Sequence, residues 1–349
     1  MLCSTPFYTL FFLPNLKRLN VADNWFTDNW FDRSLLPSEF GNFQSLTHLN
    51  LSDSGFSGQI PSEISRLSSL VSLDLSKNRH LIKAPVWKRV IGNLTQLREL
   101  LLDSTNMSSI RPNSFMNLSS SLTTLSLQEC ELQGKLKDYI LCLPSIQTLD
   151  LSYNQLLIIK APVWKRVIGN LTQLRELLLD STNMSSIRPN SLMNLSSSLT
   201  TLSLRSCDLR GKLENNILCL PSIQTLDLTG NWDLEGPLLK SNCSYSSLKF
   251  LGLSGRMFSR EFLNSISNLK SLKHLALPGC NFTGSIPAWL GNLTKLTYLN
   301  LSNNTFSGLL PSSLFNLPNL STLYLEDNQL VGPLPSHFQR RDAKDNWKA

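Results

Sequence analysis

The sequence predicts an α/β solenoid: a right-handed curved superhelix with short parallel strands on its inner face and 3₁₀ turns or short helices outside. Two observations predict it. Residues 83–127 recur as residues 160–204 with a single change, from Phe115 to Leu192. Residues 10–24 also parallel residues 314–328 almost position for position. A stack of interchangeable units tolerates such a duplication, whereas a protein with one closed core rarely does.

The repeated unit is L-x-x-L-x-L-x-x-N, where the Leu positions also accept Ile or Val. Its starts are Leu16, Leu46, Leu70, Leu97, Leu122, Ile146, Leu174, Leu199, Ile223, Leu248, Leu272, Leu296 and Leu320. The chain therefore holds about thirteen repeats, and the duplicated passage extends the stack without disrupting it.

The spacing predicts one short strand in each repeat. In x-L-x-L-x, alternate residues face opposite sides, so the leucines enter a core and their neighbours face solvent. The remainder of each repeat returns as a short helix or 3₁₀ turn, and Pro61 and Pro287 suit its first turn. A single repeat cannot bury its own leucines, but neighbouring repeats bury them for one another.

The ninth residue of the unit is expected in a buried turn, where a polar side chain bonds the backbone of adjacent repeats. Six repeats have Asn at this position: Asn24, Asn78, Asn154, Asn231, Asn304 and Asn328. Cys130, Cys207 and Cys280 hold this place elsewhere, which gives them a structural role, whereas Arg256 does not fit and predicts a distorted repeat. Cys142 and Cys219 share one sequence context; we favour buried thiols there over local bridges to Cys130 and Cys207.

Residues 290–338 resemble the plant-specific class of leucine-rich repeats. The class carries L-x-G-x-[IL]-P after the Asn, which forms a second short strand. The motif appears as FSGQIP at Phe56, FTGSIP at Phe282, FSGLLP at Phe306 and LVGPLP at Leu330. The repeats that start at Leu70, Leu97, Ile146 and Leu174 lack it. The resemblance extends over nearly the whole chain.

Two further passages, SCDLRGKLENNILCLPSIQTLDLTGN and GCNFTGSIP, resemble the ectodomains of disease-resistance receptor-like proteins. The resemblance implies recognition of a peptide, protein or glycan ligand, signalling through a co-receptor kinase, and a place on the extracellular face of the plasma membrane or in the apoplast. The family's signal peptide, cysteine-paired caps and membrane helix are not found in this sequence, so we expect a fragment of a receptor-like protein.

The expected organisation is an irregular N-terminus at 1–9, a leucine-rich-repeat solenoid at 10–338 and a polar tail at 339–349. Within the solenoid, the block 74–151 is duplicated as 150–228.

Composition and motifs argue against several function classes. The net charge of +7 is spread along the chain, so no nucleic-acid partner is expected. No apolar run reaches the ~20 residues of a membrane span. The seven cysteines form no C-x-x-C pair, and the sequence contains neither G-x-S-x-G nor a phosphate loop. We expect no metal, no cofactor and no enzymatic activity.

The expected ligand-binding site is the exposed face of the strands near the C-terminal end. Its candidate residues are Arg205, Phe250, His274, Tyr298, Asn300, Tyr324, Glu326 and Asp327. Exposed aromatic residues are frequent binding anchors. Candidate N-glycosylation sites, which indicate a secreted protein, are Asn93, Asn106, Asn117, Asn170, Asn183, Asn194, Asn242, Asn281, Asn292, Asn303 and Asn319.

Two alternatives remain at this point. The chain could be a secreted inhibitor of pathogen cell-wall hydrolases, similar to polygalacturonase-inhibiting proteins. It could instead be a truncated, non-functional remnant, in which the internal duplication reflects relaxed selection.

Overall fold

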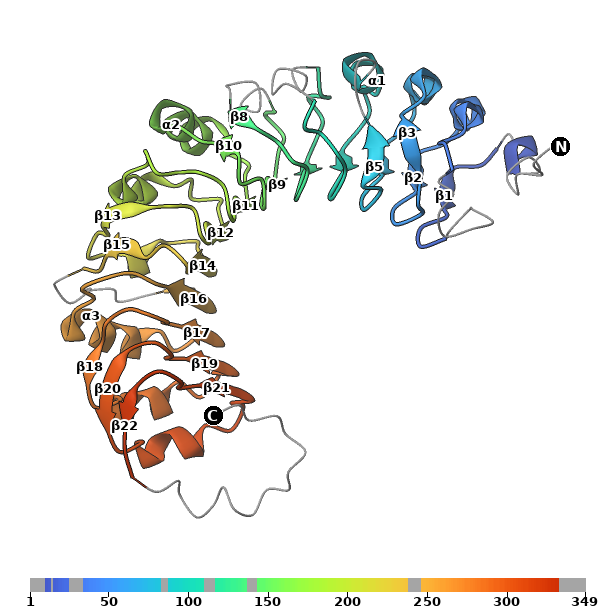
Figure 1. Ribbon diagram of the computed structural model, residues 1–349. Coiled ribbons are helices and arrows are strands. Elements are labelled where there is room, and N and C mark those ends of the chain that lie inside the picture. Colours follow the sequence, from blue (N-terminus) through green and yellow to red (C-terminus); the bar gives the residue numbers. More distant parts are fainter. Residues whose placement is uncertain are drawn as a thin grey trace. The chain divides into compact units, whose positions relative to one another are not determined.

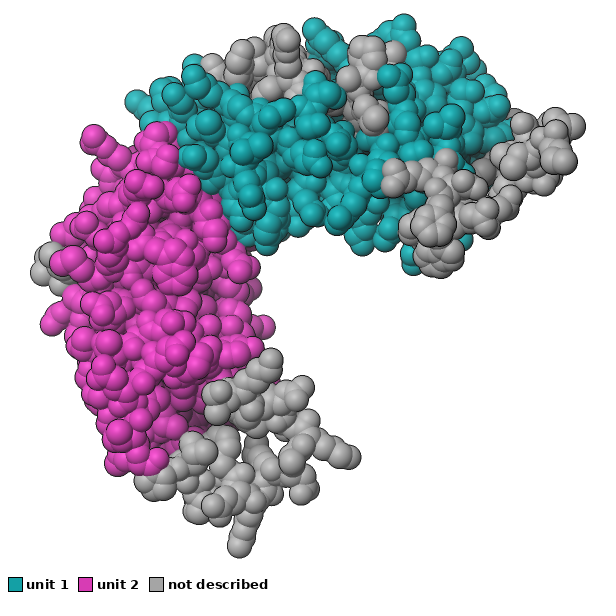
Figure 2. All heavy atoms as spheres, in the orientation of Figure 1, with its two compact units in different colours: residues 1–183 teal, residues 184–349 magenta. Residues whose placement is uncertain are grey.

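The structure is a computed structural model that describes residues 10–13, 15–24, 34–82, 87–109, 117–136, 143–237 and 246–332. The expected irregular start at 1–9, the tail at 339–349 and Asn242 lie outside these ranges. The chain divides into two compact units, Met1–Asn183 and Met184–Ala349, which Figure 2 colours separately.

Unit 1 contains one parallel strand for each predicted repeat start. In sheet order these strands are β1 (Arg18–Asn20), β2 (His48–Asn50), β4 (Ser72–Asp74), β6 (Glu99–Leu101), β7 (Thr124–Ser126), β9 (Thr148–Asp150) and β11 (Glu176–Leu178). Equivalent residues of successive repeats are partners, as Leu49 and Leu73 are. The register is therefore the one that the leucine pattern predicts.

Unit 2 continues the same pattern. Its strands are β12 (Thr201–Ser203), β14 (Thr225–Leu228), β16 (Phe250–Leu253), β17 (His274–Ala276), β19 (Tyr298–Asn300) and β21 (Thr322–Tyr324). In each unit the strands lie along one side and the helical segments along the opposite side (Figure 1). The predicted class, a leucine-rich-repeat solenoid, is confirmed.

The core is a stack of leucines. Leu226, Leu251, Leu275 and Leu299 stand at one repeat position in successive strands, and each is fully buried. Burying one such side chain stabilises the fold by about 2 kcal/mol. Because the leucines of one repeat are covered by those of the next, this stabilisation requires the stack.

The outer side consists of short helices, as expected. The α-helices are α1 (Trp87–Asn93), α2 (Ala161–Asn170) and α3 (Arg260–Ser265). The 3₁₀ segments are η1 (Leu10–Phe12), η2 (Ser38–Asn42), η3 (Ser62–Arg66), η6 (Pro189–Asn194), η7 (Ile217–Cys219), η8 (Ile266–Asn268), η9 (Ala288–Asn292) and η10 (Ser312–Asn316). η3 and η9 begin directly after Pro61 and Pro287, so each proline stands just before the first turn and not, as expected, within it.

A second set of short strands lies between the inner sheet and the helices. The pairs are β3 (Ser57–Gln59) with β5 (His80–Ile82), β8 (Gly134–Lys135) with β10 (Leu157–Ile158), and β13 (Arg210–Lys212) with β15 (Asp233–Glu235). β18 (Thr283–Gly284), β20 (Thr305–Gly308) and β22 (Gln329–Leu330) form a group of three. β5 and β10 belong to repeats that lack the L-x-G-x-[IL]-P motif. Backbone pairing with a neighbouring repeat is therefore enough to form a second strand without the motif.

The asparagines at the ninth position tie successive repeats together. The Asn78 Nδ2 group donates to the carbonyls of Leu51, Leu75 and Ser76, at 2.8, 3.0 and 3.3 Å. Its Oδ1 atom accepts from the backbone N–H groups of Ser54 and Phe56 in the preceding repeat. Asn154, Asn231 and Asn304 repeat this arrangement. One side chain thus satisfies five buried backbone groups.

The three cysteines at the ninth position are buried and form no disulfide. The Cys130 Sγ atom faces the Leu102 carbonyl at 3.1 Å, which supports the structural role expected for this position.

Cys219 corrects the expectation of a buried thiol, because it is disulfide-bonded. The expected alternative of a bridge to Cys207 is also wrong, since Cys207 forms no disulfide. Cys142 lies outside the described residues.

Arg256 does not distort its repeat. Strand β16 keeps its register with both neighbours. The Arg256 side chain points outward, where it pairs with Asp233 and its Nε atom donates to the Trp232 carbonyl at 3.3 Å.

Candidate functional site

The strand face of unit 2 is formed by the third and fifth residues of each repeat, which flank the buried leucine of the strand. The strand register places the third-position residues beside one another in the order Thr201, Thr225, Phe250, His274, Tyr298 and Thr322. Neighbouring parallel strands lie about 4.8 Å apart, so flat rings at these positions can stack.

Four aromatic side chains form a continuous row on this face, which we call the aromatic ladder: Phe250, His274, Tyr298 and Tyr324. The Phe250 and His274 ring centroids are 4.0 Å apart with 12° between the planes. His274 and Tyr298 stack at 3.9 Å and 6°. Tyr324 closes the row with a tilted contact of 5.6 Å to Tyr298. Because the faces of the inner rings cover one another, ring edges and the tyrosine hydroxyls are left for a ligand.

Beside Phe250 and His274, the fifth position is occupied by the small residues Gly252 and Ala276. The Gly252 position has room only for hydrogen, because a Cβ atom there would lie 2.6 Å from Asp227 Oδ1. The buried Asp227 carboxylate accepts hydrogen bonds from the Thr229 N–H and hydroxyl groups. Its other oxygen lies 3.7 Å from Arg205 Nε. A fixed ion pair therefore borders the ladder.

His274 is kept neutral in this setting. Partial burial, followed by the positive charge of Arg205, lowers the pKa of His274 from 6.5 to about 4. Above that pH the imidazole carries one donor and one acceptor nitrogen, and the middle of the ladder is uncharged.

The remaining expected site residues separate into two groups. Asn300 lies beside Tyr324 in the register, and its Oδ1 atom accepts from the N–H and hydroxyl groups of Ser302. Glu326 and Asp327 follow β21 in an exposed turn and do not join the ladder. The sequence predicted all four ladder residues singly. The shared repeat position of Phe250, His274 and Tyr298 was the signal that they are neighbours in the sheet.

The strand face of unit 1 has a different character, because it carries the carboxylates of Asp74, Glu99, Asp150 and Glu176. Asp103 and Asp180 add further negative charge just beyond the ends of β6 and β11. Burial raises the pKa of Asp150, and the charges of Asp103 and Asp180 add to this effect. Asp103 Oδ1 accepts from the Ser126 hydroxyl at 2.6 Å.

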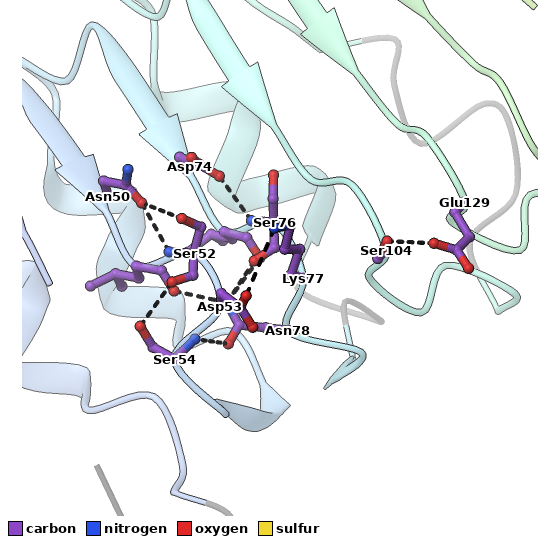
Figure 3. A network of polar contacts seen from close by, with 12 residues as sticks. Asn50, Ser52, Asp53, Ser54, Asp74, Ser76, Lys77, Asn78, Ser104 and Glu129 are labelled. Carbon is purple, nitrogen blue, oxygen red and sulfur yellow. Dashed lines mark hydrogen bonds and ion pairs between the residues drawn. The ribbon is translucent and has the colours of Figure 1, made fainter. Parts of the chain in front are cut away.

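The turns that follow these strands hold a polar network (Figure 3). Lys77 Nζ lies 3.8 Å from Asp53, and the Ser104 hydroxyl donates to Glu129 at 2.7 Å. These side chains line a hollow of about 680 Å³ at the carboxyl ends of the strands. The repeat pattern marks residues after the strands, such as Asp53, Lys77 and Glu129, as exposed, but it does not predict that they line a hollow.

The described part of the chain holds no group of three or more His, Cys, Asp or Glu residues placed to bind a metal ion. The same residues contain no helix that is both long and apolar enough to span a bilayer.

Three family models match the chain, and each describes the same repeat. The model described as "Leucine rich repeat" matches residues 95–156 and 270–330. Two models, described as "Leucine Rich Repeat" and "Leucine Rich repeat", match residues 45–67 and 12–29. The matches lie in both units and agree with the strand register.

The chain is similar to curated plant proteins. It is 37% identical to "Receptor-like protein Cf-9" of Solanum pimpinellifolium over 190 residues, and these residues cover 54% of this chain and 21% of that protein. It is 35% identical over 207 residues to "Receptor-like protein 6" of Arabidopsis thaliana, which covers 57% of this chain and 20% of that protein. The chain thus spans about a fifth of the length of these relatives.

Solved structures with the same fold include plant receptors. The plant peptide hormone receptor RGFR1, in complex with RGF2, has a TM-score of 0.65 and 27% identity, over 92% of this chain and 49% of that one. The Arabidopsis receptor kinase HAESA, in complex with the peptide hormone IDA and the co-receptor SERK1, has a TM-score of 0.50 and 26% identity, over 92% of this chain and 64% of that one. A bacterial protein, LIC12759 of Leptospira interrogans, has a TM-score of 0.67 and 27% identity, over 93% of this chain and 75% of that one. The fold alone therefore does not specify a plant receptor.

Proposed function

The chain belongs to the leucine-rich-repeat proteins and resembles the plant receptor-like proteins among them, and on this premise we propose that it is a non-catalytic recognition module. It binds a peptide or protein ligand on the strand face of unit 2 and serves defence or developmental signalling. The observation that carries the proposal is the aromatic ladder of Phe250, His274, Tyr298 and Tyr324.

The ladder has the properties of a binding anchor. Its rings are partly exposed and already stacked, so a ligand orders few new rotamers when it binds. Ring edges and tyrosine hydroxyls can contact both apolar side chains and the backbone of a polypeptide. Aromatic residues with these features are enriched among the residues that dominate binding energies.

The compartment and the partners of the module follow from the same premise. We place it at the extracellular face of the plasma membrane or in the apoplast, and the disulfide of Cys219 supports an oxidising compartment. The HAESA structure, which includes a peptide hormone and a co-receptor, supports a co-receptor kinase as a second partner. Inhibition of a secreted hydrolase is the alternative function, and the acidic strand face of unit 1 favours a basic enzyme as its target.

The test is selection of peptide ligands with the chain secreted from insect cells. Peptides from a random-sequence display library are selected on the wild type, and their affinities are measured by fluorescence anisotropy. We expect Tyr298→Ala combined with Tyr324→Ala to weaken binding at least about tenfold. The control is Trp289→Ala, which removes an aromatic side chain from η9 on the outer side.

Circular dichroism must show that all variants remain folded. Peptides that bind the ladder variant and the wild type equally would contradict the proposal. Inhibition of a polygalacturonase by the purified chain, without selectable peptides, would favour the alternative.

A further inference from the structure

Unit 1 has a second recess at the carboxyl ends of its strands, separate from the strand face. Its volume is about 350 Å³, and its wall includes Glu129, Glu131, Leu132, Tyr153 and Leu156. We call this recess the glutamate hollow. It lies next to the hollow of about 680 Å³, and Glu129 lines both.

The walls of the glutamate hollow are fixed by backbone hydrogen bonds. The Glu129 N–H group donates to the Ser152 carbonyl at 2.9 Å, and the Tyr153 N–H group donates to the Asp180 carbonyl at 2.6 Å. The Leu132 N–H group donates to Asn154 Oδ1 at 2.9 Å. Two successive turns are therefore held by the same ladder of bonds that orders the solenoid, and the recess exists before any ligand binds.

The hollow combines an apolar wall with carboxylates. Tyr153 and Leu156 are large hydrophobic side chains that remain 45% and 68% exposed, whereas Leu132 is buried at the base. Glu131 is exposed on the same wall. A ligand that fits must offer an apolar stem and a positive charge at its end.

The neighbouring hollow shows how this chain satisfies such carboxylates. The larger hollow contains its own cations: Arg79 Nη2 lies 3.6 Å from Glu129 Oε1, and Lys77 pairs with Asp53. No Lys or Arg is among the described residues that line the glutamate hollow. In the smaller recess, Glu129 is thus already paired with Arg79, whereas no cation stands beside Glu131 among the described residues that line the recess.

We propose that the glutamate hollow binds an arginine side chain of a partner polypeptide. The guanidinium group lies against the Glu131 carboxylate, with Glu129 beside it, and stacks on the Tyr153 ring, while the arginine methylenes cover Leu156. Arginine fits better than lysine, because its planar group can pair with a carboxylate and stack on an aromatic ring at once. This site is independent of the aromatic ladder in unit 2.

The test uses a capped peptide amide, Gly-Ser-Arg-Ser-Gly, titrated against the full chain and followed by nuclear magnetic resonance of the peptide. The control peptide replaces arginine with citrulline, a neutral side chain of nearly the same shape. We expect the citrulline peptide to bind about tenfold more weakly, since it lacks the charge-assisted hydrogen bond. Affinity for the arginine peptide must also fall in high salt.

Three variants locate the site. Glu131→Gln and Tyr153→Ala are each expected to weaken binding of the arginine peptide at least about fivefold. Tyr153→Phe, which keeps the ring, is expected to bind nearly as the wild type does. Glu63→Gln, on η3 at the outer side of unit 1, is the matched control for loss of a carboxylate.

The outcomes separate this inference from the proposed function. Binding of the arginine peptide must be unchanged in the variant that combines Tyr298→Ala with Tyr324→Ala. Equal binding of the arginine and citrulline peptides would overturn the inference. The same conclusion follows if folded Glu131→Gln and Tyr153→Ala chains bind like the wild type, or if no chain binds the arginine peptide at millimolar concentration.

Discussion

The His274 ring lies parallel to the Tyr298 ring, with 3.9 Å between centroids and 6° between planes. The imidazole is thus held in a stack whose burial, together with Arg205, lowers its pKa from 6.5 to about 4. Between these pH values the unfolded chain binds a proton at this residue that the folded chain does not. Stability therefore falls as the pH drops from 6.5 towards 4.

His274→Phe is expected to remove this part of the pH dependence while keeping a stacked ring. Thermal unfolding followed by circular dichroism at pH 7.0 and at lower pH measures it: the melting temperature of the wild type should fall more than that of the variant. His48→Phe, at the same repeat position in β2, is the control. Parallel curves for the wild type and His274→Phe would refute the assignment.

A second prediction concerns the asparagine ladder. Asn78→Ala leaves five backbone groups without their partner, three carbonyls and two N–H groups. Since each net hydrogen bond is worth about 1 kcal/mol, and buried unsatisfied groups cost more, we expect a loss of about 3–5 kcal/mol. Urea unfolding measures the change.

Asn24→Ala is the matched control for this loss. The Asn24 side chain is exposed, and among the described residues it donates to the nearby carbonyls of Val21 and Ala22. We expect a loss of about 1 kcal/mol or less. Equal losses at the two positions would show that the bonds between repeats contribute little.

The sequence was sufficient for those features that depend on the repeat. The spacing of leucines predicted both the strands and their register, because a leucine can be buried only at one phase of the strand. The asparagine positions followed from the same rule. The state of Cys219 did not, because nothing in its local context distinguishes a thiol from a disulfide.

The candidate site was predicted residue by residue but not as an arrangement. Phe250, His274 and Tyr298 were identified as exposed, yet their stacking depends on rotamers that the repeat pattern does not specify. The glutamate hollow was missed for another reason: Glu131, Tyr153 and Leu156 follow the strands in turns, where side-chain direction depends on backbone angles rather than on alternation. Glu131 and Tyr153 both have positive φ, 57° and 60°.

Removal of one charge from the acidic face of unit 1 is expected to stabilise the chain. The pKa of Asp150 is raised, first by burial and then by Asp103 and Asp180. Its charged form is therefore disfavoured in the folded state, and the stabilisation present at low pH is lost as the pH rises through the folded pKa. Asp150→Asn removes this loss and keeps an oxygen to accept from the Ser152 N–H group.

We therefore expect Asp150→Asn to melt at a higher temperature than the wild type at pH 7, with the difference vanishing below the ordinary Asp pKa of 3.8. Asp74→Asn, at the same repeat position in β4 with an equivalent bond to Ser76, is the control and should gain less. A lower melting temperature for Asp150→Asn at pH 7 would mean that its charge has an attractive partner.

The pattern of N-glycosylation provides a test of which face is open to ligands. Asn93, Asn170 and Asn292 stand exposed at the ends of α1, α2 and η9 on the outer side. Asn300 also lies in an N-x-S sequence, but it sits half-buried on the strand face, where its Oδ1 atom already accepts two hydrogen bonds from Ser302.

When the chain is secreted from a eukaryotic host, we expect glycans at Asn93, Asn170 and Asn292 and none at Asn300. Enzymatic removal of the glycans in heavy-oxygen water, followed by peptide mass spectrometry, marks each occupied asparagine. A glycan at Asn300 would stand beside Tyr324, its partner in the register, and would cover the end of the aromatic ladder. Full occupancy of Asn300 would therefore contradict the proposal that the strand face of unit 2 binds the ligand. An unmodified Asn292 would show only that this outer site is not used.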